Sequence, residues 1–126
     1  MNVPDGLRYT QDHEWARLEG GGVRVGITDY AQDALGDVVF VQVPDVGTAV
    51  ESGAAFSEVE STKSVSDVYA PVAGTVVEVN TSLADSPQQL NEDPYGDGWI
   101  CVIEPHRVSD YEALMDAESY RQLISS

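Results

Sequence analysis

The chain has 126 residues, of which 22 are acidic and 6 are basic, and its formal net charge is −16. This length suits one domain with a single modest hydrophobic core. Nucleic acids and anionic membrane surfaces are disfavoured as partners, because binding them requires lysine and arginine patches that this chain cannot build. The acidity is typical either of steering toward enzymes with basic docking surfaces or simply of a solubilising surface.

The chain shows no segment for membrane insertion, export or cross-linking. No apolar run approaches the length of a membrane span, and the first five residues carry no basic or apolar targeting signal. We therefore expect a cytoplasmic protein of a bacterial type, or an organelle form that has lost its presequence. The single cysteine, Cys101, excludes an internal disulfide framework, and no Cys/His cluster predicts a structural zinc.

The N-terminal third predicts an antiparallel hairpin followed by a short helix. Strand-forming residues occur over 7–18, glycines occupy 20–22, and apolar residues alternate with polar or small ones over 23–27. Asp29 and Gln32 then form a capping-box pattern, and Gly36 suits the end of a helix.

The middle and C-terminal parts predict further strands and two helices. Residues 37–43 are apolar on both faces, which favours a central strand, and 75–79 predict another strand. The segment 80–98 is poor in β-branched residues and predicts mostly loop. A last strand over 99–104 ends at Pro105 and would place three residues on one buried face, namely Trp99, Cys101 and Ile103.

Two capping patterns predict the C-terminal helices. Ser109 with Glu112 forms a second capping box, which opens a short helix through Met115. Asp116 is expected to cap a final amphipathic helix. That helix contains Tyr120, Leu123 and Ile124. The whole pattern predicts a β-rich sandwich or barrel of short strands, with one small helix after residue 27 and helices at the C-terminus.

Lys63 is the only lysine, and it lies between two β-rich runs. Small polar residues surround it, so the pattern predicts a hairpin with its turn near Thr62 and Lys63. A lysine at such a tip holds its amine on a four-carbon stem away from the body, where a modifying enzyme can acylate it. Taken alone, an ordinary solvated surface lysine is the more economical interpretation.

The residues flanking this hairpin resemble the lipoyl and biotinyl carrier domains. A Gly-x-x-Val-x-x-Gly turn over 47–53 precedes the lysine, and Ala-Pro-x-x-Gly over 70–74 follows it. The context Glu60-Ser61-Thr62-Lys63-Ser64 resembles the H-protein family of the glycine cleavage system. The Met-Lys-Met of biotin carriers and the Asp-Lys-Ala of acyltransferase lipoyl domains are not present.

Three further motifs extend the resemblance from about Leu7 to the last helix. Residues 12–15 (Asp-His-Glu-Trp) resemble the family's His-Glu-Trp entry, 26–37 its next segment, and 94–99 its Pro-Tyr-x-x-Gly-Trp signature. The resemblance implies a mainly β barrel-sandwich hybrid. It also implies a single lipoyl-carrier domain over 1–126, with a core of about 20–105 and a C-terminal helical segment of about 109–125.

The resemblance further implies that Lys63 carries lipoic acid in amide linkage. The oxidised arm would take the aminomethyl group of glycine from glycine decarboxylase (P protein) and deliver it to the aminomethyltransferase (T protein). Dihydrolipoamide dehydrogenase (L protein) would then reoxidise the arm. A lipoyl or octanoyl transferase, or a lipoate ligase, would attach the arm to an otherwise monomeric carrier.

The same resemblance implies that the loaded arm folds back into a groove on the protein. Glu14 and Asp67 would offer carboxylates to its amine, with Asp12 as a third candidate. Asp12 departs from the family pattern, since several members carry a small hydroxyl residue there. Without the resemblance, Glu14 and Asp67 would be interpreted as ordinary exposed acids.

The competing interpretations are an enzyme and two other carriers. Asp12, His13 and Glu14 offer an acid and a base, but adjacent strand residues point to opposite faces. Cys101 with His106 could form a thiol dyad, yet Cys101 is expected to be buried. The sequence therefore predicts a carrier rather than an enzyme, with no metal site. A lipoyl domain of a 2-oxoacid dehydrogenase would lack the motifs at 12–15 and 94–99, whereas an H-like paralogue serving lipoyl relay remains open.

Overall fold

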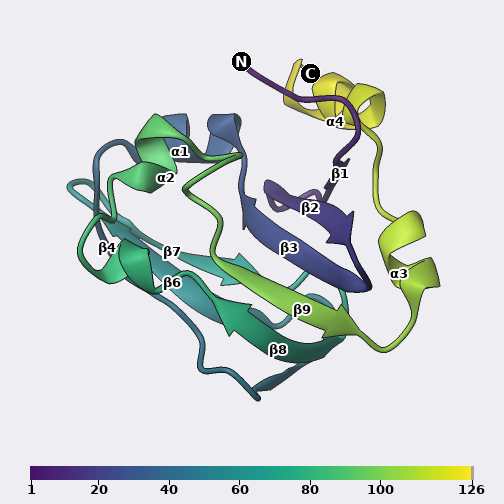
Figure 1. Ribbon diagram of the computed structural model, residues 1–126. Helices are drawn as coiled ribbons and strands as arrows, with labels where there is room; N and C mark the ends of the chain where they lie inside the picture. The colour runs from purple at the N-terminus through teal and green to yellow at the C-terminus, as the bar shows by residue number, and fades with distance from the viewer. Residues whose placement is uncertain (126) are drawn as a thin grey trace.

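The computed structural model describes residues 1–125, and over this range nine strands form two antiparallel sheets (Figure 1). The larger sheet has the strand order β1-β2-β3-β9-β8-β5. Its strands are β1 (Arg8–Tyr9), β2 (Glu14–Glu19), β3 (Gly22–Ile27), β5 (Ala49–Val50), β8 (Gly74–Val79) and β9 (Cys101–Pro105). The smaller sheet has the order β4-β6-β7. Its strands are β4 (Val38–Gln42), β6 (Ala55–Ser61) and β7 (Val65–Tyr69).

Short helices connect and flank the sheets. They are α1 (Asp29–Leu35), the 3-10 helix η1 (Thr81–Ala84), α2 (Gln89–Glu92), α3 (Val108–Glu112) and α4 (Ala117–Ser125). The predicted mainly β sandwich with a helix after the first hairpin and helices at the C-terminus is confirmed. The segment 80–98 is less irregular than predicted, since it contains both η1 and α2. None of the helices described is long and apolar enough to cross a membrane.

The buried side chains form two clusters. The main core lies between the sheets and draws on both of them, with Val23, Val25, Cys101 and Ile103 from the larger sheet and Val41, Val59 and Val68 from the smaller one. The second cluster joins the two ends of the chain and contains Val3, Leu7, Tyr9, Trp15, Ala117 and Tyr120. Because successive strand residues point to opposite faces, β2 contributes Ala16 to the main core and Trp15 to the second cluster. Helix α4 therefore packs near the N-terminus, where Figure 1 shows both chain ends.

Two strand predictions are wrong in an informative way. Strand β4 is an edge strand, since it pairs with β6 alone in the smaller sheet. A register irregularity between Val38 and Phe40 leaves Val39 and Phe40 about half exposed, at 52% and 50%. Trp99 precedes β9 and packs on the second cluster, so it does not share the buried face of the strand. The Arg24 guanidinium lies 4.2 Å from the Trp99 ring centroid.

The ends of α1 explain how the chain turns from β3 toward β4. Its N-cap is Thr28 rather than the predicted Asp29, because the Thr28 Oγ1 atom accepts a hydrogen bond from the Ala31 amide at 3.2 Å. Gln32 instead donates from its side chain to Asp29 Oδ1 at 2.7 Å. The predicted end at Gly36 is confirmed, with a φ of 83° that favours glycine.

The two C-terminal helices differ in how they begin. Helix α3 has Arg107 as its N-cap residue and no side-chain capping hydrogen bond, so the predicted capping box of Ser109 and Glu112 is wrong. The helix also ends at Glu112 rather than continuing to residue 115. The predicted cap of the last helix is confirmed, since the Ser119 amide donates to Asp116 Oδ1 at 2.9 Å.

Candidate functional site

Lys63 lies in the turn that joins β6 to β7, at the position the sequence predicts. The Ser61 side chain builds this turn without any glycine, because its Oγ atom accepts the amide hydrogens of Lys63 and Ser64, each at 3.1 Å. The Ser61 amide donates to the Ser64 carbonyl at 2.8 Å, and the Thr62 amide donates to the Asp37 carbonyl at 3.0 Å. The backbone at the tip is thus fixed on both sides while Lys63 itself is exposed.

The stem of Lys63 lies across the end of α1. A Cβ atom built on Gly36 would come within 2.9 Å of Lys63 Cε and 3.5 Å of Nζ, so the glycine leaves the space that the stem occupies. The C-terminal end of a helix carries partial negative charge, which favours a nearby ammonium group. Gly36 therefore both ends the helix and leaves room for the outer part of the lysine side chain, from Cδ to Nζ, a role that the sequence pattern did not indicate.

A pocket of about 180 Å³ lies between α1, the turn before β2, and strands β6 and β7. Its apolar lining residues are Ile27, Ala31, Ala34, Leu35, Val59 and Val68, and its polar ones are Asp12, His13, Glu14, Tyr30, Ser66 and Asp67. The three residues that the family resemblance implies for arm docking, Asp12, Glu14 and Asp67, thus line the same pocket although Asp67 is distant in the chain from the other two.

Glu14 is the most unusual of these carboxylates, because its side chain is only 2% exposed. The Thr10 hydroxyl donates to its Oε1 atom at 2.5 Å, and the Tyr69 amide donates to its Oε2 atom at 3.2 Å. Burial raises the pKa of Glu14 to about 7, and the neighbouring charge of Asp12 adds to this, although the two hydrogen bonds oppose it. Glu14 is therefore not the ordinary exposed acid of the alternative interpretation, whereas Asp12 and Asp67 are exposed.

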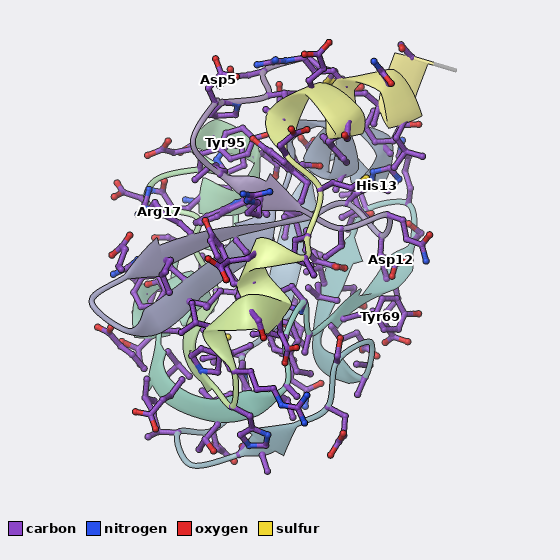
Figure 2. The ribbon with its side chains drawn as sticks, turned by 90° about the vertical axis from the view of Figure 1, so that its right-hand side faces the viewer. Asp5, Asp12, His13, Arg17, Tyr69 and Tyr95 are labelled. Carbon is purple, nitrogen blue, oxygen red and sulfur yellow. The ribbon has the colours of Figure 1, made fainter. Side chains whose placement is uncertain are left out.

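His13 has a left-handed backbone conformation with a φ of 71°, and no other described residue except glycine has a positive φ. Its Nδ1 atom lies 2.8 Å from the Tyr120 hydroxyl, and its ring packs on Tyr30 with the centroids 4.6 Å apart. Burial lowers the pKa of His13, so the imidazole is neutral near pH 7. Figure 2 shows Asp12 and His13 on the turn that leads into β2.

This turn corrects the predicted geometry of residues 12–14. Strand β2 begins only at Glu14, so Asp12, His13 and Glu14 do not alternate along a strand, and all three line the pocket. They still form no acid–base pair, because His13 bonds to Tyr120 and Glu14 bonds to Thr10 and to the Tyr69 amide.

The other enzyme-like candidates do not converge either. Cys101 lies in the main core, where burial raises the pKa of its thiol to about 12, while His106 is exposed. Among residues 1–125 there is no group of three histidine, cysteine or acidic side chains that could hold a metal ion.

Comparison with known proteins identifies the family. The family model described as "Glycine cleavage H-protein" matches residues 7–126. The chain belongs to the glycine cleavage H-protein family. Members of this family are carrier proteins rather than enzymes. The match favours an H protein over the lipoyl domain of a 2-oxoacid dehydrogenase, which was the alternative carrier.

Individual relatives match along almost the whole chain. A glycine cleavage system H protein of Anaeromyxobacter sp. (strain K) is 54% identical over 124 residues, which cover 98% of this chain and 97% of the relative. One from a strain of Thermus thermophilus is 54% identical over 126 residues, covering 100% of this chain and 98% of the relative. The crystal structure of a glycine cleavage system H protein from Mycobacterium marinum superposes with a TM-score of 0.90 at 45% identity, covering 98% of this chain and 100% of that one.

Proposed function

We propose that this H-protein family member carries a lipoyl group on Lys63 and shuttles the aminomethyl group of glycine from the P protein to the T protein. The L protein then reoxidises the arm, and a lipoyl or octanoyl transferase or a lipoate ligase attaches it. The observation that carries this proposal is the placement of the only lysine on a rigid, exposed turn beside a pocket lined by carboxylates. The expected setting is a single-domain monomer in the cytoplasm.

The residues around Lys63 fit a lipoyl group. Its stem already lies across Gly36 at the end of α1, and the last residues of α1 line the pocket. Pockets that enclose a drug-sized ligand span about 300–1,000 Å³. A pocket of about 180 Å³ therefore suits the end of an arm rather than its whole length. When attached, a lipoyl group would supply the dithiol chemistry that accepts and releases the one-carbon amine.

The chain itself supplies anchorage, shelter and charge. The apolar side chains of α1, β6 and β7 line one part of the pocket and limit the access of water there. Glu14 lies in this part with a pKa of about 7, so its carboxyl group is protonated below that pH and ionised above it. A cationic amine beside Glu14 favours the ionised carboxylate and forms a charge-assisted pair with it. Asp67 and Asp12 are exposed, so their attraction for the amine is weaker and is screened by salt.

The surrounding acidity suits partners with basic docking surfaces. A net charge of −16 raises the encounter rate with such surfaces and disfavours association between copies of the chain. Tethering also keeps the cargo at a high local concentration while the carrier moves from one enzyme to the next.

The test is intact-mass measurement of the protein isolated from its native host, together with the variant Lys63→Arg. We expect a single lipoyl group on the native protein and none on Lys63→Arg, which keeps the positive charge but lacks the acylatable amine. A lipoyl signal or aminomethyl transfer that survives in Lys63→Arg would refute the assignment.

A further inference from the structure

Tyr120 of α4 connects two parts of the pocket that it does not itself line. Its side chain is fully buried, and its hydroxyl oxygen lies 2.7 Å from Thr28 Oγ1 and 2.8 Å from His13 Nδ1. Thr28 is the N-cap of α1, the helix that supplies one wall. His13 belongs to the turn before β2, which supplies another part of the pocket lining. The Tyr120 hydroxyl thus bonds to both of the elements that carry these residues, which are also joined by a hydrogen bond from the Thr28 amide to the His13 carbonyl at 3.0 Å.

The turn that carries His13 needs such a restraint. A residue other than glycine rarely adopts a positive φ, and it does so only where its surroundings over-determine the conformation. At a φ of 71°, the His13 ring bonds to Tyr120 and packs on Tyr30. The His13 amide also donates to the Thr10 carbonyl at 3.2 Å, and its carbonyl accepts from the Thr28 amide at 3.0 Å, so Tyr120 supplies the only hydrogen bond to the side chain among several restraints on the described residue. Residues 117–125 of α4 contribute nothing to the pocket lining itself.

We propose that Tyr120 is a positioning residue for the arm, because its hydroxyl group holds the turn at residues 12–14 and the start of α1 at the separation that a seated arm requires. This inference rests on the proposed function. Without the hydroxyl, the restraints on His13 are reduced to its packing on Tyr30 and its backbone hydrogen bonds to Thr10 and Thr28, and the Thr28 hydroxyl at the start of α1 loses one partner. The pocket then no longer has one defined shape, although the Lys63 turn is unaffected.

The chain offers a matched control for the variant Tyr120→Phe. The rings of Tyr9 and Tyr120 are stacked with centroids 4.7 Å apart and an interplanar angle of 8°. The Tyr9 hydroxyl donates to the Pro4 carbonyl at 2.5 Å, in the second cluster rather than at the pocket. Tyr9→Phe therefore removes the same atom from the same stack without touching either pocket wall.

Two NMR measurements test the inference. In the unmodified protein, the imidazole nitrogen shifts of His13 report its bond to Tyr120, with the exposed His106 as internal reference. In the second measurement, amide shifts of Ala31 and Ala34 are compared between the unmodified and the lipoylated protein. Loss of one net hydrogen bond corresponds to about a 2- to 10-fold fall in the population of the seated arm. We expect Tyr120→Phe to change the His13 nitrogen shifts and to reduce the lipoyl-dependent shifts accordingly, while Tyr9→Phe resembles the wild type.

Each other outcome overturns the inference. Wild-type behaviour of Tyr120→Phe in both measurements refutes it, and so does an equal loss in Tyr9→Phe, which would mean a general effect on the stack. If the mass shows lipoylation of Lys63 but the wild type has no lipoyl-dependent shifts at the pocket, the inference fails while the proposed function stands. If circular dichroism shows that Tyr120→Phe is unfolded, His13→Asn replaces it, because asparagine tolerates a positive φ but is too short to keep the bond. Unchanged lipoyl-dependent shifts in His13→Asn then refute the inference.

Discussion

Replacing Glu14 by glutamine should make the protein more stable at alkaline pH and should leave its stability nearly unchanged in acid. The reason is that Glu14 is buried and its pKa is about 7 in the folded protein, against an ordinary value of 4.5 in an unfolded chain. Between these two values the folded state binds more protons than the unfolded state, so the free energy of unfolding falls as the pH rises. The contribution of Glu14 is complete below about pH 4.5 and is lost above about pH 7.

The size of the effect follows from the same two values. Each pH unit between them corresponds to about 1.4 kcal/mol, so ionising Glu14 costs the folded protein about 3 kcal/mol. Glutamine avoids this cost because it stays neutral while its carbonyl oxygen still accepts one of the two hydrogen bonds, from either the Thr10 hydroxyl or the Tyr69 amide. The net gain at pH 8 is therefore at most about 3 kcal/mol, reduced by about 1 kcal/mol if the other donor loses its partner.

Urea denaturation of Glu14→Gln and wild type at pH 4, 6 and 8 measures this difference. Asp67→Asn is the control, because Asp67 lines the same pocket but is exposed, and we expect it to stay within about 0.5 kcal/mol of wild type at each pH. Since every other titrating group is shared, the difference between variant and wild type isolates Glu14. Parallel pH profiles for Glu14→Gln and wild type would refute the assignment of a buried, largely protonated carboxyl group.

Two further predictions separate packing from cargo binding. Ile103 is fully buried in the main core, so Ile103→Ala should lower the free energy of unfolding by about 2–5 kcal/mol. Lys63→Ala at the exposed turn should stay within about 0.5 kcal/mol of wild type. Equal losses of the two variants in thermal denaturation would mean that one of the two environments is misassigned. The double variant Glu14→Gln and Asp67→Asn should be lipoylated normally but should lose the aminomethyl group faster in the absence of T protein. The rate of loss should rise by about 10-fold for each 1.4 kcal/mol of interaction between the amine and the two carboxylates that the variant removes. Formaldehyde or ammonia release at the wild-type rate would show that neither carboxylate shelters the cargo.

Much of the fold could be predicted because the local signals agree with the tertiary structure. Period-2 alternation and three consecutive glycines specify the first hairpin, and Gly36 ends α1 as expected. The prediction that β4 is a central strand is wrong, because apolar residues on both faces of a strand occur in the sequence whether or not a second strand pairs with it. Val39 and Phe40 are exposed because of a register irregularity against β6, and no local pattern specifies that.

The site was predictable only where its chemistry depends on a single residue. Lys63 is the sole lysine and has characteristic neighbours, so its position on a turn could be predicted. The buried carboxyl group of Glu14 accepts a hydrogen bond from the Tyr69 amide, which lies 55 residues away in the chain. The His13 ring bonds to Tyr120, which is 107 residues away. These are properties of the packed protein, and periodicity or capping patterns contain no information about them.

A buried carboxyl group with a raised pKa suits a carrier because its attraction for a cation depends on whether water is present. Two unit charges 4 Å apart attract by about 4 kcal/mol in a partly shielded protein site but by only about 1 kcal/mol in water. In the proposed function, Glu14 therefore attracts a bound amine more strongly than an exposed acid does, because Glu14 is buried beside the apolar side chains of α1 and β6. An enzyme that draws the arm out of the pocket breaks this pair and returns the amine to water, where most of the attraction is lost. Exposed acids such as Asp67 cannot switch in this way, because water already surrounds them, and their contribution is to steer the approach of cations and of basic partner surfaces.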